Sequence, residues 1–169
     1  MNIYLTSGTP DFMEKVVRKH TKESIILLLG QSNAVLLHES DKKSVFAVPR
    51  PFQVLDGIGT FEQRGYFVFH NIALTDESRE VFEQKWLAHS DTVKKNEALI
   101  AYRFIKPKKN EPYIIITQWA GPASYEVWTK SDIYLQQIAP LFDKTSSLVN
   151  DIFNTASHIA TYSAPPLDA

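Results

Sequence analysis

Five histidines are the residues of this 169-residue chain best suited to hold a metal or to move protons. None lies three or four residues from another, so no local pair has the spacing of a helical metal site. The chain has no cysteine, which excludes thiolate metal sites, iron–sulfur clusters, disulfides and cysteine nucleophiles. These histidines could bind one metal together only if the fold brings them into contact. The five are His20, His38, His70, His89 and His158.

Other short motifs and the charge balance narrow the chemistry further. The sequence has no Walker loop, no dinucleotide-binding GxGxxG, no GxSxG and no HExxH. Eighteen Lys and Arg against 19 Asp and Glu give a net charge of −1, so no large positive field awaits nucleic acid or an anionic membrane. We interpret Lys106, Lys108 and Lys109 as the solvated tip of a hairpin. Their functional interpretation is a docking point for a carboxylate or propionate.

His70 and Trp128 are each open to two interpretations. His70 lies in a predicted strand, 66–74, where it shares an apolar face with Val68 and Ile72 while Asn71 points to the other face. A lone histidine on such a face is ordinarily a core residue, and the alternative is a site residue. Trp128 lies among polar neighbours on a short predicted helix, 122–130. A tryptophan there either covers the core or forms the wall of a ligand pocket.

The elements that would position these residues follow from the hydrophobic pattern. The length and the 44% hydrophobic content predict one globular domain or two small packed ones. From residue 65 the predicted order is strand, helix, strand, strand, helix, strand, which is the ferredoxin-like order. The first 60 residues repeat it in part, with strands at 2–7, 23–29, 34–38 and 44–48, a helix that Thr9 caps, and one or two helical turns at 52–58.

The apolar runs are too short to span a bilayer, and the first residues show no basic segment followed by an apolar one. The sequence therefore predicts a cytoplasmic protein without a membrane segment or a signal peptide.

Residues 114–131, IIITQWAGPASYEVWTKS, carry a resemblance to a known family. A strand ends in Thr-x-Trp, and an aromatic residue and then Trp-x-x-Ser follow. This pattern resembles the antibiotic-biosynthesis-monooxygenase (ABM) superfamily and, within it, the Isd-type heme-degrading monooxygenases. The strand FHNIALT resembles the first strand of that domain. The segments YLTSGTPDF and GQSNAVLLHE resemble the two-part HmoB/TRAP-like group, so the resemblance covers nearly the whole chain.

The resemblance implies an α+β fold in two parts. A ferredoxin-like ABM domain, 64–169, would pack on a β-rich N-terminal subdomain, 1–63, and together they would form a pseudo-dimeric barrel. The N-terminal part would cover the apolar sheet face that a second subunit buries in single-domain relatives. We therefore expect a monomer.

The resemblance also implies a site made of an Asn on the first strand, a Trp on the later helix, and a His ten residues after that Trp. Trp128 matches, but Ile138 stands where the His is expected, and the Asn position falls on His70 with Asn71 next to it. The candidate catalytic residues are Trp128, His70 and Asn71. Trp128 and His70 would hold heme, and His70 would bind its iron, with His158 as the alternative and His20 and His38 as further candidates.

The implied activity is oxygen-dependent heme degradation, which opens the porphyrin and releases iron. Heme would be both cofactor and substrate, and it would need dioxygen and an external electron donor, an unidentified reductase. Two alternatives stay open at this point. One is a non-catalytic heme-binding or signalling protein of the same fold, and the other is a cofactor-independent monooxygenase that acts on an aromatic substrate.

Overall fold

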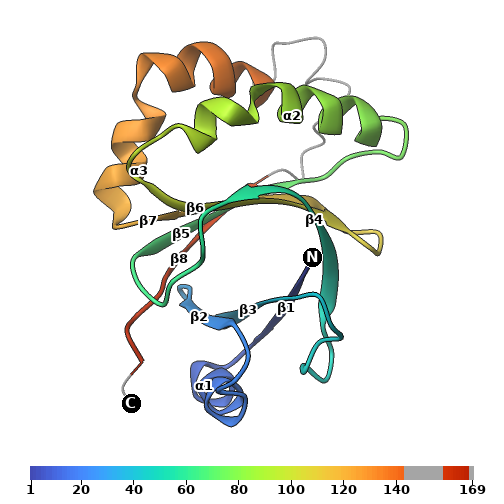
Figure 1. Cartoon of the computed structure of the whole chain (residues 1–169), viewed down its shortest axis with the longest axis vertical. Helices are drawn as coiled ribbons and strands as arrows, with labels where there is room; N and C mark the ends of the chain where they lie inside the picture. The colour runs from blue at the N-terminus through green and yellow to red at the C-terminus, as the bar shows by residue number, and fades with distance from the viewer. Residues whose placement is uncertain (143–157, 168–169) are drawn as a thin grey trace.

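A computed structural model describes residues 1–142 and 158–167, in which eight antiparallel strands close into a barrel (Figure 1). Three α-helices lie outside the barrel, followed by a π-helical turn, η1, and a 3-10 turn, η2. The strands are β1 (Asn2–Gly8), β2 (Ile25–Leu29), β3 (Ala34–Ser40), β4 (Arg50–Ile58), β5 (Tyr66–Ile72), β6 (Leu99–Pro107), β7 (Tyr113–Trp119) and β8 (His158–Ser163). The helices are α1 (Pro10–Lys19), α2 (Arg79–Lys94), α3 (Pro122–Thr129), η1 (Tyr134–Ile138) and η2 (Ala139–Phe142).

The strand order confirms the predicted α+β barrel. Around the barrel the strands run β1-β3-β2-β8-β5-β7-β6-β4. Within this circle, β8-β5-β7-β6 is the fourth, first, third and second strand of its half, which is the ferredoxin-like arrangement. The strands β4-β1-β3-β2 repeat the same arrangement in the first half. One chain therefore supplies both sheets of the barrel. The predicted boundary between residues 63 and 64 falls in the loop from β4 to β5, and the division into two domains stays a prediction.

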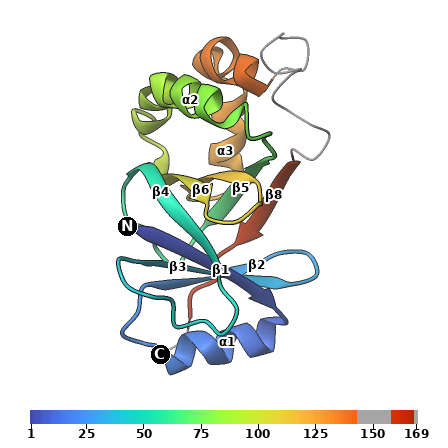
Figure 2. The ribbon, with the colours of Figure 1, turned by 90° about the vertical axis from the view of Figure 1, so that its right-hand side faces the viewer.

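Three apolar clusters hold these elements together. The barrel interior is filled by side chains from both halves, including Leu5, Phe52 and Phe67. A second cluster lies outside the barrel beneath α1, and a third lies beneath α2 and α3. Figure 2 shows α1 and the pair α2 and α3 at opposite ends of the molecule. The strands therefore bury apolar side chains on both faces, which explains why their sequences read as continuous apolar runs rather than alternating ones.

Two predicted elements are wrong, and both lie before β5. Residues 52–58 belong to strand β4 rather than to helical turns, and residues 44–48 form no strand. Strand β4 is stabilised by pairing with β1 on one side and β6 on the other, so it joins the two halves. Gly57 is needed for this pairing because an added Cβ would lie 2.6 Å from Cδ of Arg103 and 2.9 Å from O of Tyr102.

Helix α2 also begins later than predicted, at Arg79 rather than directly after Thr75. The Oγ1 of Thr75 lies 2.7 Å from Oγ of Ser78, so these two hydroxyls contact each other ahead of the helix. None of the helices in residues 1–142 and 158–167 is long and apolar enough to cross a membrane.

Candidate functional site

A small cavity lies between the outer face of the sheet and the helical layer. Its volume is about 40 Å³, and β5, β7, α2, α3 and the η1–η2 segment contribute its walls. Two of the sequence-predicted site residues, His70 and Trp128, meet here although 57 residues separate them in the chain. The side chains that matter to its chemistry are His70, Trp86, Trp128, Tyr134, Ile138 and Phe142.

His70 reaches the cavity because of its place in β5. It pairs with Ile115 of β7 and Ile159 of β8, and its ring centroid lies 4.1 Å from that of Phe142. Burial lowers the pKa of His70 to about 4, and the positive charge of His158 adds to the effect. His70 is therefore neutral at pH 7, and a neutral imidazole is the form that can bind a metal or accept a hydrogen bond.

Trp128 forms a wall of the cavity and is held by other aromatic rings. It is 8% exposed, its ring stacks on Trp119 at 6.4 Å between centroids, and Tyr134 meets it edge-on at 5.5 Å. The indole Nε1 of Trp86 donates to Tyr102 and that of Trp119 donates to Thr117. By contrast, the Nε1 of Trp128 has no hydrogen-bond partner within residues 1–142 and 158–167. Packing alone therefore holds Trp128 in the described part of the chain.

Position 138 gives the clearest departure from the expected site. The resemblance places an iron-binding His ten residues after Trp128, and Ile138 does line the same cavity as Trp128 and His70. Position 138 therefore lies beside Trp128 and His70, but the isoleucine side chain there cannot bind iron. His70 is the one histidine among the described residues that lines this cavity.

Asn71 and His158 lie on the other face of the sheet. Asn71 follows His70 in β5, so its side chain points away from the cavity, and its Nδ2 donates to O of Phe69 at 3.4 Å. His158 stands opposite Asn71 in the register of β5 and β8 and shares its face. The structure therefore separates these two predicted candidates from the face that carries His70 and Trp128.

The two N-terminal candidates lie by α1, at the other end of the molecule. His38 is fully buried, its Nε2 lies 3.0 Å from Oε2 of Glu23, and its ring packs between Tyr4 and Phe46. His20 caps the C-terminal end of α1. Neither lines the cavity, and in the described residues no group of three or more His, Asp or Glu is placed to hold a metal ion.

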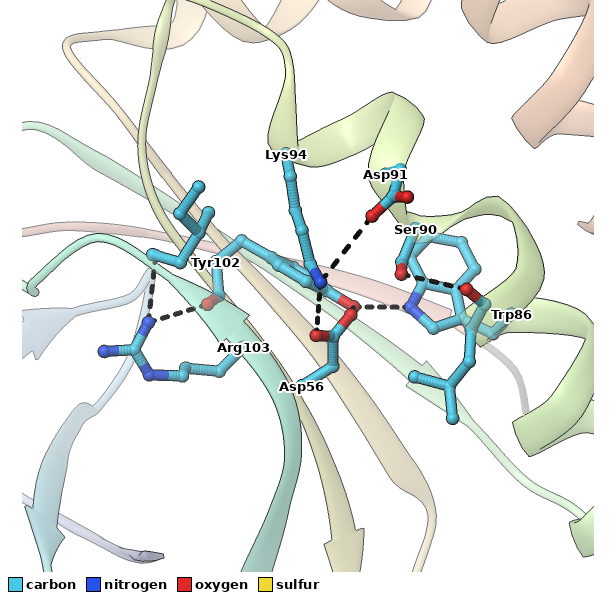
Figure 3. A network of polar contacts seen from close by, with 9 residues as sticks. Asp56, Trp86, Ser90, Asp91, Lys94, Tyr102 and Arg103 are labelled. Atoms are coloured by element: carbon cyan, nitrogen blue, oxygen red, sulfur yellow. Dashed lines mark hydrogen bonds and ion pairs between the residues drawn. The ribbon is translucent and has the colours of Figure 1, made fainter.

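A polar network that the sequence analysis missed fixes the α2 wall of the cavity (Figure 3). The Nε1 of Trp86 donates to the hydroxyl of Tyr102 at 2.6 Å, and this hydroxyl donates to Asp56 at 3.1 Å. The Nζ of Lys94 lies 2.5 Å from the other oxygen of Asp56. Burial alone would raise the pKa of Asp56, but hydrogen bonds from Lys94, Ser90 and Tyr102 outweigh it and lower the pKa.

This network orients Trp86, which lines the cavity, and it ties α2 to β4 and β6. Burial raises the pKa of Tyr102 far above its ordinary value, so its hydroxyl keeps its proton. The available sequence signal was the spacing of Trp86, Ser90 and Lys94, which places them on one face of a helix. Nothing in the sequence pairs that face with Asp56, which comes from a strand that was predicted as helical.

The residues that line the cavity are chemically suited to heme, but the cavity is too small to hold it. Apolar and aromatic walls suit a porphyrin, and His70 supplies a neutral imidazole. A volume of about 40 Å³ holds only a water molecule or two, whereas small-molecule sites usually measure roughly 300–1,000 Å³. Heme would fit beside His70 only after a wall of the cavity moves.

Comparison with known sequences gives relatives named for signalling. No protein-family model matches the chain. The chain is 27% identical over 135 residues to the signal transduction protein TRAP of Staphylococcus epidermidis, which covers 79% of this chain and 80% of that protein. It is 22% identical over 132 residues to the protein of the same name in Staphylococcus aureus, with 78% of this chain and 79% of that protein covered.

The solved structures with a similar fold include both a regulatory protein and an enzyme. The structure described as a major regulator of staphylococcal pathogenesis has a TM-score of 0.86 at 19% identity and covers 98% of this chain and 100% of its own. A heme-degrading enzyme from Listeria monocytogenes has a TM-score of 0.72 at 23% identity, with 98% and 100% covered. A ferredoxin-fold protein related to antibiotic biosynthesis monooxygenases, from the same species, has a TM-score of 0.77 at 22% identity, with 98% and 95% covered.

These comparisons confirm the predicted resemblance. The chain shares its α+β barrel fold with these proteins, which include a heme-degrading enzyme and a ferredoxin-fold protein related to antibiotic biosynthesis monooxygenases. The sequence relatives carry the TRAP name. At these identities the solved structures establish the fold, and the site must establish the function.

Proposed function

We propose that this protein is an oxygen-dependent heme-degrading monooxygenase that opens the porphyrin and releases iron. The observation that carries the proposal is that His70 and Trp128 line one apolar cavity between β5 and α3. The resemblance places an Asn and a Trp at these two positions, and in this chain His70 takes the place of the Asn. The shared fold with a heme-degrading enzyme of Listeria monocytogenes supports the choice of substrate.

The residues of this chain would divide the work as follows. Heme, when bound, supplies oxygen activation and is itself the molecule that is opened. His70 would present a neutral imidazole to the iron or to its oxygen side, because its low pKa keeps it unprotonated. Trp128 would press on the plane of the ring and distort it. A role for Asn71 would need a one-residue shift of β5, which would exchange its two faces.

Heme degradation would also need dioxygen and electrons from outside the chain. No flavin or nicotinamide motif is present in the sequence, so dioxygen and electrons would come from outside, the electrons from a reductase. We place this activity in the cytoplasm and assign it to a monomer, since one chain closes the whole barrel.

A second candidate function is a non-catalytic binding or signalling protein of the same fold. Two observations favour it. Ile138 stands where the resemblance places the iron-binding side chain, and the cavity beside His70 measures only about 40 Å³. The TRAP name of the sequence relatives points the same way.

Heme titration followed by ascorbate separates these candidates. We expect heme to give a Soret band with the protein, and we expect aerobic ascorbate to bleach it while a chelator captures the iron. A stable Soret band under ascorbate, without iron release, would contradict the enzymatic function and favour the second candidate. No Soret band at all would favour a cofactor-independent monooxygenase. Catalase provides the control for this assay. If adding it abolishes the bleaching, free peroxide rather than the protein destroyed the heme.

A further inference from the structure

A second hollow lies on the other side of Trp128. It is a groove of about 480 Å³ between the C-terminal end of α2, the helix α3 and the η1 segment. This volume lies within the roughly 300–1,000 Å³ that small-molecule sites usually have. The cavity beside His70 measures about 40 Å³. The groove, unlike that cavity, already has room for a bound molecule.

Trp128 separates the groove from the cavity. Among the described residues it is the one that lines both. Its ring is held by packing on Trp119 and Tyr134, and its Nε1 has no hydrogen-bond partner in residues 1–142 and 158–167. A side chain held in this way can turn without leaving a buried polar group unpaired. Turning it aside would join the groove to the cavity.

The groove carries the chemistry of a carboxylate site beside an apolar surface. Lys95, at the C-cap of α2, is the one charged residue that lines it in the described part of the chain. Ser124 lies four residues before Trp128 on the same face of α3, so its hydroxyl is directed to the same hollow. Val127 and Ile133 line the groove with 71% and 53% of their surface exposed. A cation and a hydroxyl next to exposed apolar side chains match a flat apolar molecule that carries a carboxylate.

We propose that this groove binds the carboxylate end of a planar tetrapyrrole, with Lys95 and Ser124 as its partners, and that Trp128 turns aside to admit the ring toward His70. This inference rests on the proposed function for the choice of a tetrapyrrole. It adds a binding compartment and a route of entry to that function.

Protoporphyrin IX is the probe, because it has the two carboxylates and the flat ring but no iron. Its binding is measured by quenching of tryptophan fluorescence and by its absorbance. We expect Lys95→Gln to weaken binding roughly fivefold, the size of an exposed ion pair, while Lys130→Gln binds like the parent chain. Lys130 is a matched control because it is exposed at the C-cap of α3 and does not line the groove. We expect Ser124→Phe, which places a large ring in the groove and removes its hydroxyl, to weaken binding more than tenfold.

Stopped-flow quenching tests the movement of Trp128. Trp128→Ala removes the partition, so protoporphyrin IX should associate with it faster than with the parent chain. An equal or slower association rate would contradict the partition. Equal affinities for Lys95→Gln, Ser124→Phe and Lys130→Gln would overturn the groove as the binding site, and so would a parent chain that fails to bind protoporphyrin IX.

The two proposals fail in different ways. If Lys95→Gln and Ser124→Phe weaken the binding of protoporphyrin IX but the parent chain never degrades heme, the groove is supported and the enzymatic function is contradicted. If Ser124→Phe degrades heme as fast as the parent chain does, the enzymatic function is supported and the groove is contradicted as the binding site.

Discussion

Acid should destabilise this protein through His70, and the size of the effect follows from the structure. Burial lowers the pKa of His70 from 6.5 to about 4 in the folded protein. Between these two values the unfolded chain binds a proton at this position and the folded chain does not. Because the unfolded state then binds more protons, the stability contributed by His70 falls as the pH falls from about 6.5 to about 4 and changes little above or below that window.

The magnitude can be worked out from the same two values. The full difference corresponds to about 3 kcal/mol, and at about pH 5 roughly 2 kcal/mol of it should already be lost. These figures are upper bounds because the side chain of His70 is only partly buried. His70→Gln removes the titration and keeps a polar side chain of similar size. The free energy of unfolding of the variant, minus that of the parent chain, should therefore increase as the pH is lowered from about 7 to about 5.

Urea unfolding followed by tryptophan fluorescence, at several values from about pH 7 to about pH 5, measures this difference. His89→Gln is the matched control, since His89 lies on α2 and does not line the cavity. Its stability should fall with pH as in the parent chain. If His70→Gln loses stability with acid as steeply as His89→Gln does, His70 is not buried as a neutral imidazole, and its assignment to the cavity is wrong.

Three further outcomes are expected. Trp128→Ala should retain heme but degrade it more slowly in the ascorbate assay, because Trp128 acts on the shape of the ring more than on its affinity; a parental rate would remove Trp128 from the site. Tyr102→Phe should lower the free energy of unfolding in urea by about 1–3 kcal/mol, because it leaves the buried Nε1 of Trp86 without its acceptor, and a loss below about 0.5 kcal/mol would contradict the network. Light scattering at micromolar concentration should give the mass of one chain, 19.3 kDa, because the barrel is closed within the chain, and a stable dimer would contradict this.

Local patterns were sufficient to predict the elements that carry the site. The alternation of a strand placed His70 and Asn71 on opposite faces, and β5 has that arrangement, with the cavity on the His70 side. The short helix predicted at 122–130 is also present, as α3. These features depend on neighbours within about ten residues, which the sequence displays directly.

Strand β4 shows why other features could not be predicted. Strand β4 contains Pro51 and Gly57, residue types that usually interrupt a strand, but Gly57 serves the close approach of Arg103 and Tyr102 from β6. The choice between strand and helix was made by pairing with β1 and β6, which lie far away in the sequence. The small volume of the cavity could not be predicted either, because it depends on the packing of Phe142 against His70, which lies far away in the sequence. Contacts of this range leave no local pattern.

Heme difference spectra of the parent chain, His70→Ala and His89→Ala test the central claim most directly. If heme binds beside His70, the parent chain and His89→Ala should give the same Soret band. His70→Ala should give a shifted band or a heme affinity lower by about tenfold or more, as expected for the loss of a direct contact to the iron or its oxygen side. Identical bands and affinities in all three proteins would show that heme, if it binds, does not bind in the cavity between β5 and α3.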